Sequence, residues 1–171
     1  AVTEVLVAKA PGSAETFKAN AAKLMARIDA LAAAINNELA PVKDKPFIVF
    51  YDSAVSFAEF KDEAERLAGY LQHECGVEAG DRVLLYMQNS PQWVLAFYAI
   101  LRANAVVVPV NPMNRTDELR HYVEDCQATT VFVAQDLLPQ MQPLLRPQAG
   151  GGLQHLVVAT YSDYLKRPTD L

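Results

Sequence analysis

The sequence predicts an α/β fold: a partial doubly wound, mostly parallel sheet with helices on both faces, preceded by a long N-terminal helix and a small β-hairpin. Three observations lead to this prediction. Apolar residues recur every three or four positions over 13–39, which is the period of one helix face. Short, continuous apolar runs follow from residue 82 onward and alternate with helical patterns. Such runs are typical of parallel strands that are covered on both faces.

Composition bounds the class of protein. The 171 residues are 51% hydrophobic, which is enough to bury a core and too apolar for a disordered chain. A net charge of -5 argues against a nucleic-acid binder, whose mark is a basic patch. The longest apolar run, 93–101, is far shorter than the roughly 20 residues of a transmembrane helix. With two cysteines, no CxxC pair and no leader pattern, we expect a cytoplasmic protein without a transmembrane segment.

The first elements are a helix and a hairpin. One amphipathic helix is expected over 13–39, and Pro41 should end it. Its apolar stripe consists of Phe17, Ala21, Leu24, Met25, Ile28, Leu31, Ala32, Ile35 and Leu39. Strands at 47–51 and 55–57, around an Asp52-Ser53 turn, predict the hairpin. Residues 1–45 are therefore predicted to be a helical extension, and residues 46–171 an incomplete α/β subdomain.

The helix after the hairpin has clear signals at both ends. Ser56 and Glu59 have the spacing of a capping box, in which each side chain accepts a hydrogen bond from a free N–H of the helix start. Gly76 should end the helix in a left-handed conformation. The expected buried face is Phe60, Ala64, Leu67, Ala68 and Leu71.

Strands and helices then alternate. Strands are expected at 82–87, 105–110, 129–133 and 154–159, and helices at 91–103, 116–126 and 136–146. Ser90 followed by Pro91 is a helix start signal, and so is Thr116 followed by two acidic residues. Pro143 should break the last helix, because it removes a backbone hydrogen bond. The helix over 91–103 is apolar nearly all round and should be deeply buried.

In such a sheet, ligands bind beyond the carboxyl ends of the strands. The candidate binding residues there are Asn89, Ser90 and Asn111, although Asn and Ser at such positions more often cap helices. The sequence contains neither GxGxxG nor GxxxxGK[ST]. The glycines at 150–152 precede a strand instead of a helix, so a plain turn is favoured over a phosphate loop.

Other chemistry-bearing residues do not assemble into a site. His73-Glu74-Cys75 and the pair His121 and Glu124 offer too few ligands for zinc, and solvated helix surfaces are the stronger interpretation. Cys126 lies on an apolar stripe and is interpreted as core. No Ser-His-Asp arrangement can be assembled from the sequence. We therefore expect this chain by itself to hold no catalytic residue, no cofactor and no metal.

Residues 55–133 resemble the N-terminal part of adenylate-forming enzymes, the superfamily of acyl-CoA synthetases, peptide-synthetase adenylation domains and luciferases. Five ordered blocks carry the resemblance: VSFAEF at 55–60, GVEAGDRV at 76–83, NSP at 89–91, LRANAVVVPVNP at 101–112 and TDEL at 116–119. Asn104 stands where the family usually has Gly, and both residues tolerate a left-handed backbone. The segment NPMNRTDEL, residues 111–119, is closer to the corresponding segment of fatty-acid and related CoA ligases than to that of peptide-synthetase domains.

The resemblance implies a reaction for a parent enzyme. A carboxylate attacks the α-phosphate of ATP to give an acyl-adenylate and pyrophosphate, and the thiol of coenzyme A then takes the acyl group. The family's segments for ATP, Mg and coenzyme A are not among these residues, so the chain is expected to be scaffold and inactive alone. Its expected partners are the remaining C-terminal portion of the same enzyme and, through an exposed sheet edge, a second copy of itself.

Two alternatives remain open. The chain could be a stand-alone interaction or regulatory module that keeps the ligase scaffold, with the charged N-terminal helix as a docking surface. It could also be a flavodoxin-like or receiver-like domain. A receiver needs an acidic pair near the end of its first strand and an acceptor Asp after the third. Residues 87–89 and 133–135 do not supply these acids, so this alternative ranks last.

Overall fold

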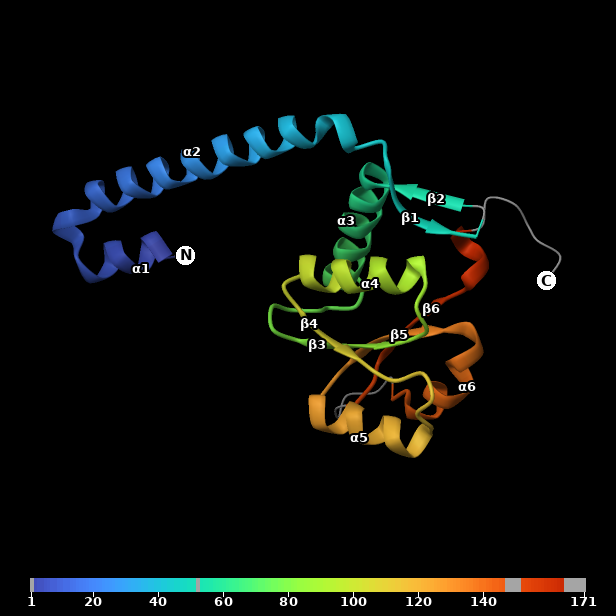
Figure 1. The fold of residues 1–171 in the computed structure, drawn as a ribbon. Helices are drawn as coiled ribbons and strands as arrows, with labels where there is room; N and C mark the ends of the chain where they lie inside the picture. The colour runs from blue at the N-terminus through green and yellow to red at the C-terminus, as the bar shows by residue number, and fades with distance from the viewer. Residues whose placement is uncertain (1, 52, 147–151, 165–171) are drawn as a thin grey trace. The chain divides into compact units, whose positions relative to one another are not determined.

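The computed structural model describes residues 2–51, 53–146 and 152–164 (Figure 1). The chain divides into two compact units, residues 1–43 and residues 44–171. No helix within the described residues combines the length and the apolar character that a membrane crossing requires.

The first unit is a pair of helices. Helix α1, Val2–Lys9, is joined through the 3-10 turn η1, Pro11–Ser13, to helix α2, Ala14–Leu39. A second 3-10 turn, η2, Ala40–Val42, follows at Pro41. Helix α1 folds back on the first turns of α2 (Figure 1). The long helix is where the apolar period predicts it, whereas α1 is an addition that the sequence pattern did not reveal.

The second unit opens with the expected hairpin. Strand β1, Pro46–Phe50, pairs antiparallel with β2, Ser53–Ser56. Of the predicted turn, Asp52 lies outside the described residues and Ser53 belongs to β2. The ring of Phe47 contacts the rings of Phe57 and Phe60, with centroids 4.7 and 4.6 Å apart. This aromatic contact joins the hairpin to the helix that follows it.

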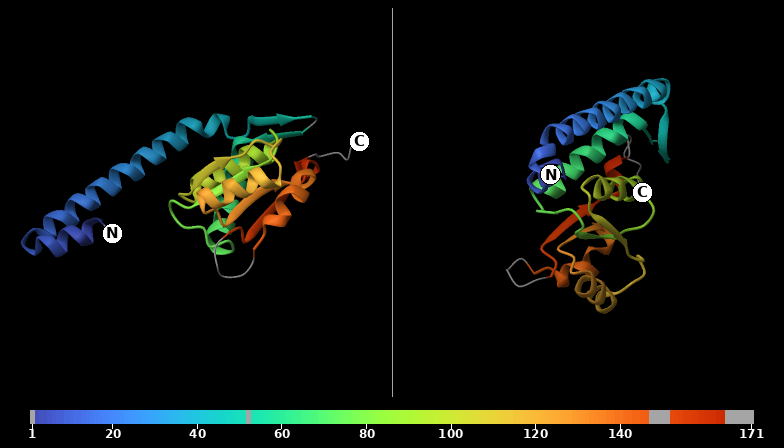
Figure 2. Two further views of the ribbon diagram at one scale, coloured as in Figure 1. Left: turned by 90° about the horizontal axis from the view of Figure 1, so that it is seen from below. Right: turned by 90° about the vertical axis from the view of Figure 1, so that its left-hand side faces the viewer.

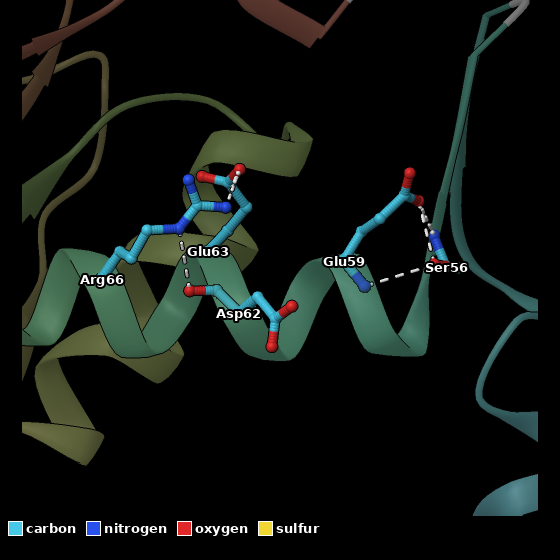
Figure 3. A network of polar contacts seen from close by, with 5 residues as sticks. All are labelled: Ser56, Glu59, Asp62, Glu63 and Arg66. Carbon is cyan, nitrogen blue, oxygen red and sulfur yellow. Dashed lines mark hydrogen bonds and ion pairs between the residues drawn. The ribbon is translucent and has the colours of Figure 1, made fainter.

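That helix, α3, Phe57–His73, has the predicted capping box (Figure 3). The Glu59 backbone N–H donates to Ser56 Oγ at 3.2 Å, and the Ser56 N–H donates to Glu59 Oε2 at 2.9 Å. The predicted face is buried at Phe60, Ala64, Ala68 and Leu71 and half-buried at Leu67. Gly76 has φ +65° after the helix end, as predicted, and the Val77 N–H donates to the Leu71 carbonyl at 2.9 Å.

The remaining strands form one parallel sheet, so the predicted fold class is confirmed. Its strands are β3, Arg82–Tyr86, β4, Val106–Pro109, β5, Thr130–Ala134, and β6, His155–Ala159, in the order β4-β3-β5-β6. Helices α3 and α4, Pro91–Arg102, cover one face, where Val83 and Phe132 are buried. Helix α5, Thr116–Cys126, and the short α6, Leu138–Met141, cover the other (Figure 2).

Two helices differ in detail from the sequence pattern. The segment predicted as a helix over 136–146 is broken as expected, into η3, Gln135–Leu137, the single turn α6, and η4, Gln142–Leu144. Pro139 and Pro143 both lie inside it and remove helix hydrogen bonds. The deep burial expected for α4 holds on its inner face, but Tyr98 and Leu101 are each 48% exposed. Apolar composition does not force burial, because folded proteins expose much apolar surface.

Strand β4 is one edge of the sheet, and it ends in a proline. The N–H groups of Val106 and Val110 donate to carbonyls of the β3 segment, at 2.7 and 3.0 Å. Backbone N–H groups alternate in direction along a strand, so position 109 faces away from β3. Pro109 lacks an N–H at this outward position, and the sheet loses no hydrogen bond there.

Candidate ligand-binding site

The carboxyl ends of the four parallel strands meet at one edge of the sheet. The direction in which the chain adds strands to the sheet reverses between β3 and β5. Helix α4 leads from β3 outward to β4, and α5 leads back past β3 to β5. Ligands of open α/β sheets bind at such a reversal, outside the carboxyl ends of the strands. The residues that flank it are Gln88 to Ser90 after β3 and Gln135 with Asp136 after β5.

The structure places all three predicted residues at this edge, but it does not bring them together in one hydrogen-bonded group. Asn89 and Ser90 follow β3, and Asn111 follows β4. Ser90 is buried, and its Oγ accepts from the Trp93 N–H at 3.1 Å, so it caps α4. Asn111 Oδ1 accepts from the Met113 N–H at 3.0 Å, which is an Asx turn. Asn89 and Asn111 are exposed, and their binding role stays a prediction.

The side chain of Tyr86, on β3, holds the loop that follows β4. This tyrosine is fully buried, and its hydroxyl donates to the Asn114 carbonyl at 2.7 Å and lies 3.3 Å from the Pro112 carbonyl. Burial raises the pKa of the Tyr86 phenol, so the hydroxyl keeps its proton for these bonds. The loop that carries Asn111 is therefore held on the sheet by a side chain of the central strand.

A second polar group lies where β6 reaches the same edge, and the sequence analysis missed it. Gln92 is 6% exposed on α4, and its Nε2 donates to the carbonyl of Thr160, which follows β6. The Gln92 Oε1 and the Tyr161 hydroxyl are buried without a hydrogen-bond partner among the described residues. The sequence signal that could have found Gln92 is its position, because it is a polar residue on the same buried helix stripe as Leu95, Ala96 and Ala99.

The carboxylate of Asp136 and the backbone of Gln88 are the neighbours that act on the Tyr161 phenol. Burial raises the pKa of this phenol, the carboxylate of Asp136 raises it further, and the nearby Gln88 backbone acts in the opposite direction. The protonated phenol can donate one hydrogen bond, and the amide oxygen of Gln92 can accept one. Together they offer a neutral donor and a neutral acceptor to a polar ligand or to another segment of protein.

A cavity of about 370 Å³ adjoins Gln92 on the α3 and α4 face of the sheet. Its wall is mainly apolar, and charged groups stand at α3 and at the turn after β6. The lining residues that matter here are Leu67, Leu95, Phe132, Val157, Arg66 and Asp163. It is an open groove and not an enclosed pocket.

The charged part of this cavity is organised around Tyr164 on the 3-10 turn η5, Tyr161–Tyr164. Arg66 pairs with Glu63 at 2.9 Å on α3 (Figure 3). Burial raises the pKa of Tyr164 to about 12, and the charges of Glu63 and Asp163 add to the rise, whereas Arg66 opposes it. Tyr164 is therefore a neutral hydroxyl at physiological pH.

The carboxyl edge presents neutral amide groups and the phenol of Tyr161. No group of three or more His, Cys, Asp or Glu side chains suited to a metal ion occurs among the described residues. Of the glycine run at 150–152, only Gly152 is among the described residues; it has φ +100° and lies three residues before the start of β6. A parallel sheet with polar residues along its carboxyl edge is the arrangement in which open α/β proteins bind their ligands.

Comparison with known proteins identifies the family. Residues 35–167 match the family of AMP-binding enzymes, and the chain belongs to that family. A long-chain-fatty-acid–CoA ligase of Escherichia coli O6:H1 is 29% identical over 139 residues, which are 81% of this chain and 24% of that protein. A crotonobetaine/carnitine–CoA ligase of Proteus mirabilis is 31% identical over 115 residues, 64% of this chain and 22% of that protein.

Solved structures agree. The anthranilate CoA ligase AuaEII in complex with anthranoyl-AMP has a TM-score of 0.64 at 27% identity, with 82% of this chain and 28% of that chain covered. The N-terminal domain of FACL13 from Mycobacterium tuberculosis has a TM-score of 0.56 at 27% identity, with 63% of this chain and 27% of that chain covered. The resemblance to adenylate-forming enzymes is therefore confirmed. The chain spans about a quarter of the length of the curated relatives it matches.

Proposed function

We propose that this chain is the N-terminal scaffold portion of an ATP-dependent acyl-CoA ligase. Such an enzyme joins a carboxylate to AMP and then transfers the acyl group to coenzyme A. The observation that carries the proposal is the family match over 35–167, together with a parallel sheet of the same fold. We further propose a fatty acid or a related carboxylate as the substrate class. The names of the long-chain-fatty-acid–CoA ligases of Escherichia coli and Bacillus subtilis support this choice.

In this proposal the chain is part of the enzyme's scaffold, and the catalytic residues lie in the remaining part of the enzyme. ATP, Mg and coenzyme A would supply activation and transfer when they are bound elsewhere. The three predicted residues of the carboxyl edge, Asn89, Ser90 and Asn111, are neutral, and the charged residues of that edge include Arg115, Asp136 and Asp163. Asn89 and Asn111 are proposed to face a ligand or the rest of the enzyme, and Ser90 to position α4. A cytoplasmic location belongs to the same proposal.

The test is carboxylate-dependent exchange between ATP and pyrophosphate. The 171-residue chain is compared with the longer protein that a coding sequence extending beyond these residues would encode, with octanoate, palmitate and benzoate as carboxylates. We expect exchange from the longer protein and none from the chain alone. Exchange by the chain alone would contradict the scaffold role. A longer protein that is folded and inactive with every carboxylate would contradict the ligase.

The second candidate is a stand-alone interaction module that keeps the ligase scaffold. The exposed apolar stripe of α2 is the observation that favours it. The coding sequence separates the two functions. A reading frame that continues into a Ser/Thr/Gly-rich loop with a Lys supports the ligase, and a stop codon directly after Leu171 supports the module.

A further inference from the structure

Helix α2 exposes an apolar stripe over most of its length. Leu24, Met25, Ile28, Leu31, Ile35 and Leu39 are between 46% and 61% exposed, and neither α1 nor α2 has a buried residue. Helix α1 lies against the first turns of α2 (Figure 2). Phe17 and Ala21 of α2 are half-buried. Four of these six residues precede residue 35, where the family match begins.

The stripe has the pattern of a helix that pairs with another helix. From Phe17 to Ile35 its apolar residues are spaced alternately by four and three, which is a heptad repeat. Ile28 and Ile35 occupy the a positions, and Leu24 and Leu31 occupy the d positions. β-Branched residues at a with leucine at d favour two-stranded coiled coils.

We propose that a second copy of this chain covers the stripe, as an antiparallel pair of α2 helices. The stripe is complementary to itself in that direction. With the pair centred between residues 29 and 30, Leu24 of one copy shares a layer with Ile35 of the other, and Ile28 shares a layer with Leu31. The two central layers are then repeated by the symmetry, as an isologous interface requires.

Charge selects the antiparallel direction. The first half of α2 carries Lys18, Lys23 and Arg27, whereas Glu38 lies at its end, in a d position. In a parallel pair, the two Glu38 carboxylates would face each other across the seam. In the antiparallel pair, Glu38 comes level with the basic turn around Lys18 and Lys23 of the second copy. The second arrangement replaces a like-charge contact with an opposite-charge contact.

The area is sufficient for a specific contact. Six side chains that are each about half exposed on two helices amount to roughly 1,000 Å² of removable surface, near the lower bound for a stable protein–protein interface. A lipid surface is the other class of occupant that fits an amphipathic helix, but it calls for a strongly basic polar face. In α2, three basic residues are balanced by Glu15, Asp29 and Glu38.

The proposal is tested with the full 171-residue chain by sedimentation over a wide concentration range. Ile28→Asp places a carboxylate in a central layer, and Ala33→Asp places the same charge on the opposite side of the same helix. We expect the unsubstituted chain and Ala33→Asp to dimerise, and Ile28→Asp to associate at least about 100-fold more weakly. Circular dichroism of both variants establishes that α2 remains helical.

Disulfide trapping tests the direction. A mixture of Leu24→Cys and Ile35→Cys chains should cross-link on oxidation. Each variant alone should cross-link far more slowly, because its two cysteines would be about 16 Å apart along the pair. The unsubstituted chain controls for Cys75 and Cys126. Faster cross-linking of Leu24→Cys alone would overturn the antiparallel direction.

Three other results would overturn the pairing itself. One is a chain that stays monomeric at every concentration. Another is a dimer that Ile28→Asp leaves intact, which would move the interface to the sheet edge. The third is a monomer that sediments with anionic phosphatidylserine vesicles, which would assign the stripe to a lipid surface. None of these readouts depends on ligase activity, so the proposed function can fail or hold separately.

Discussion

Replacement of Tyr86 by phenylalanine tests how the loop that carries Asn111 is held at the carboxyl edge. The substitution keeps the ring and removes the hydroxyl that donates to the Asn114 carbonyl at 2.7 Å and lies 3.3 Å from that of Pro112. Tyr86 itself is fully buried, whereas Pro112 and Asn114, which hold the acceptor carbonyls, are half-buried. A buried acceptor that loses its partner costs about 1–3 kcal/mol, so for these half-buried acceptors we expect Tyr86→Phe to lower the free energy of unfolding by about 1.5 kcal/mol.

The measurement is urea unfolding followed by the fluorescence of Trp93, the one tryptophan of the chain. Tyr98→Phe is the matched control. It makes the same chemical change at a tyrosine that is 48% exposed, and we expect a change below about 0.5 kcal/mol. Amide exchange at 113–115 should become faster in Tyr86→Phe alone. If the two variants have equal stability, Tyr86 does not anchor the loop through its hydroxyl.

Three further predictions concern local structure. Asn104 has φ +60°, so Asn104→Ala should lose about 1 kcal/mol in urea unfolding whereas Asn104→Gly stays within about 0.5 kcal/mol; equal losses would argue against a left-handed residue. Ser90→Ala removes the cap of α4 and should lose about 1 kcal/mol, and a loss below a few tenths would show that the cap is dispensable. The pKa of Tyr164 is raised from its ordinary 10.0 to about 12, so the stability it contributes is complete below pH 10 and is lost as the pH rises towards 12. Between pH 10 and pH 12, Tyr164→Phe should therefore lose less stability than the unsubstituted chain. The difference should be at most about 2 kcal/mol after allowance for solvent screening. Parallel curves of unfolding free energy against pH for the two proteins would refute the raised pKa.

Local signals allowed much of the fold to be predicted from the sequence. The Ser56 and Glu59 capping box, the left-handed Gly76 and the break at Pro143 each depend on neighbours within a few residues, and each is found in the structure. The alternation of strands and helices also sufficed to predict a parallel sheet. These features need no knowledge of distant contacts.

What could not be predicted depends on distant contacts or on weak local preferences. Gln92 meets Thr160 across 68 positions of sequence, and only the placement of β6 brings them together. Helix α1 has only eight residues and little amphipathic pattern, so its position follows from packing on α2. Gln127 ends α5 with φ +53°, a conformation for which glutamine has no special preference.

The proline at the end of β4 makes the two edges of the sheet differ in how they can pair with an added strand. Across the outward side of this strand, Pro109 offers no N–H, so the backbone of an added strand would find a gap in the ladder. At the opposite edge β6 ends without proline, and Val158 there is 43% exposed. A strand that pairs beside β4 would therefore lack one backbone donor at Pro109, whereas β6 has an N–H at each of its residues. A single imino acid thus makes two chemically similar edges unequal as templates.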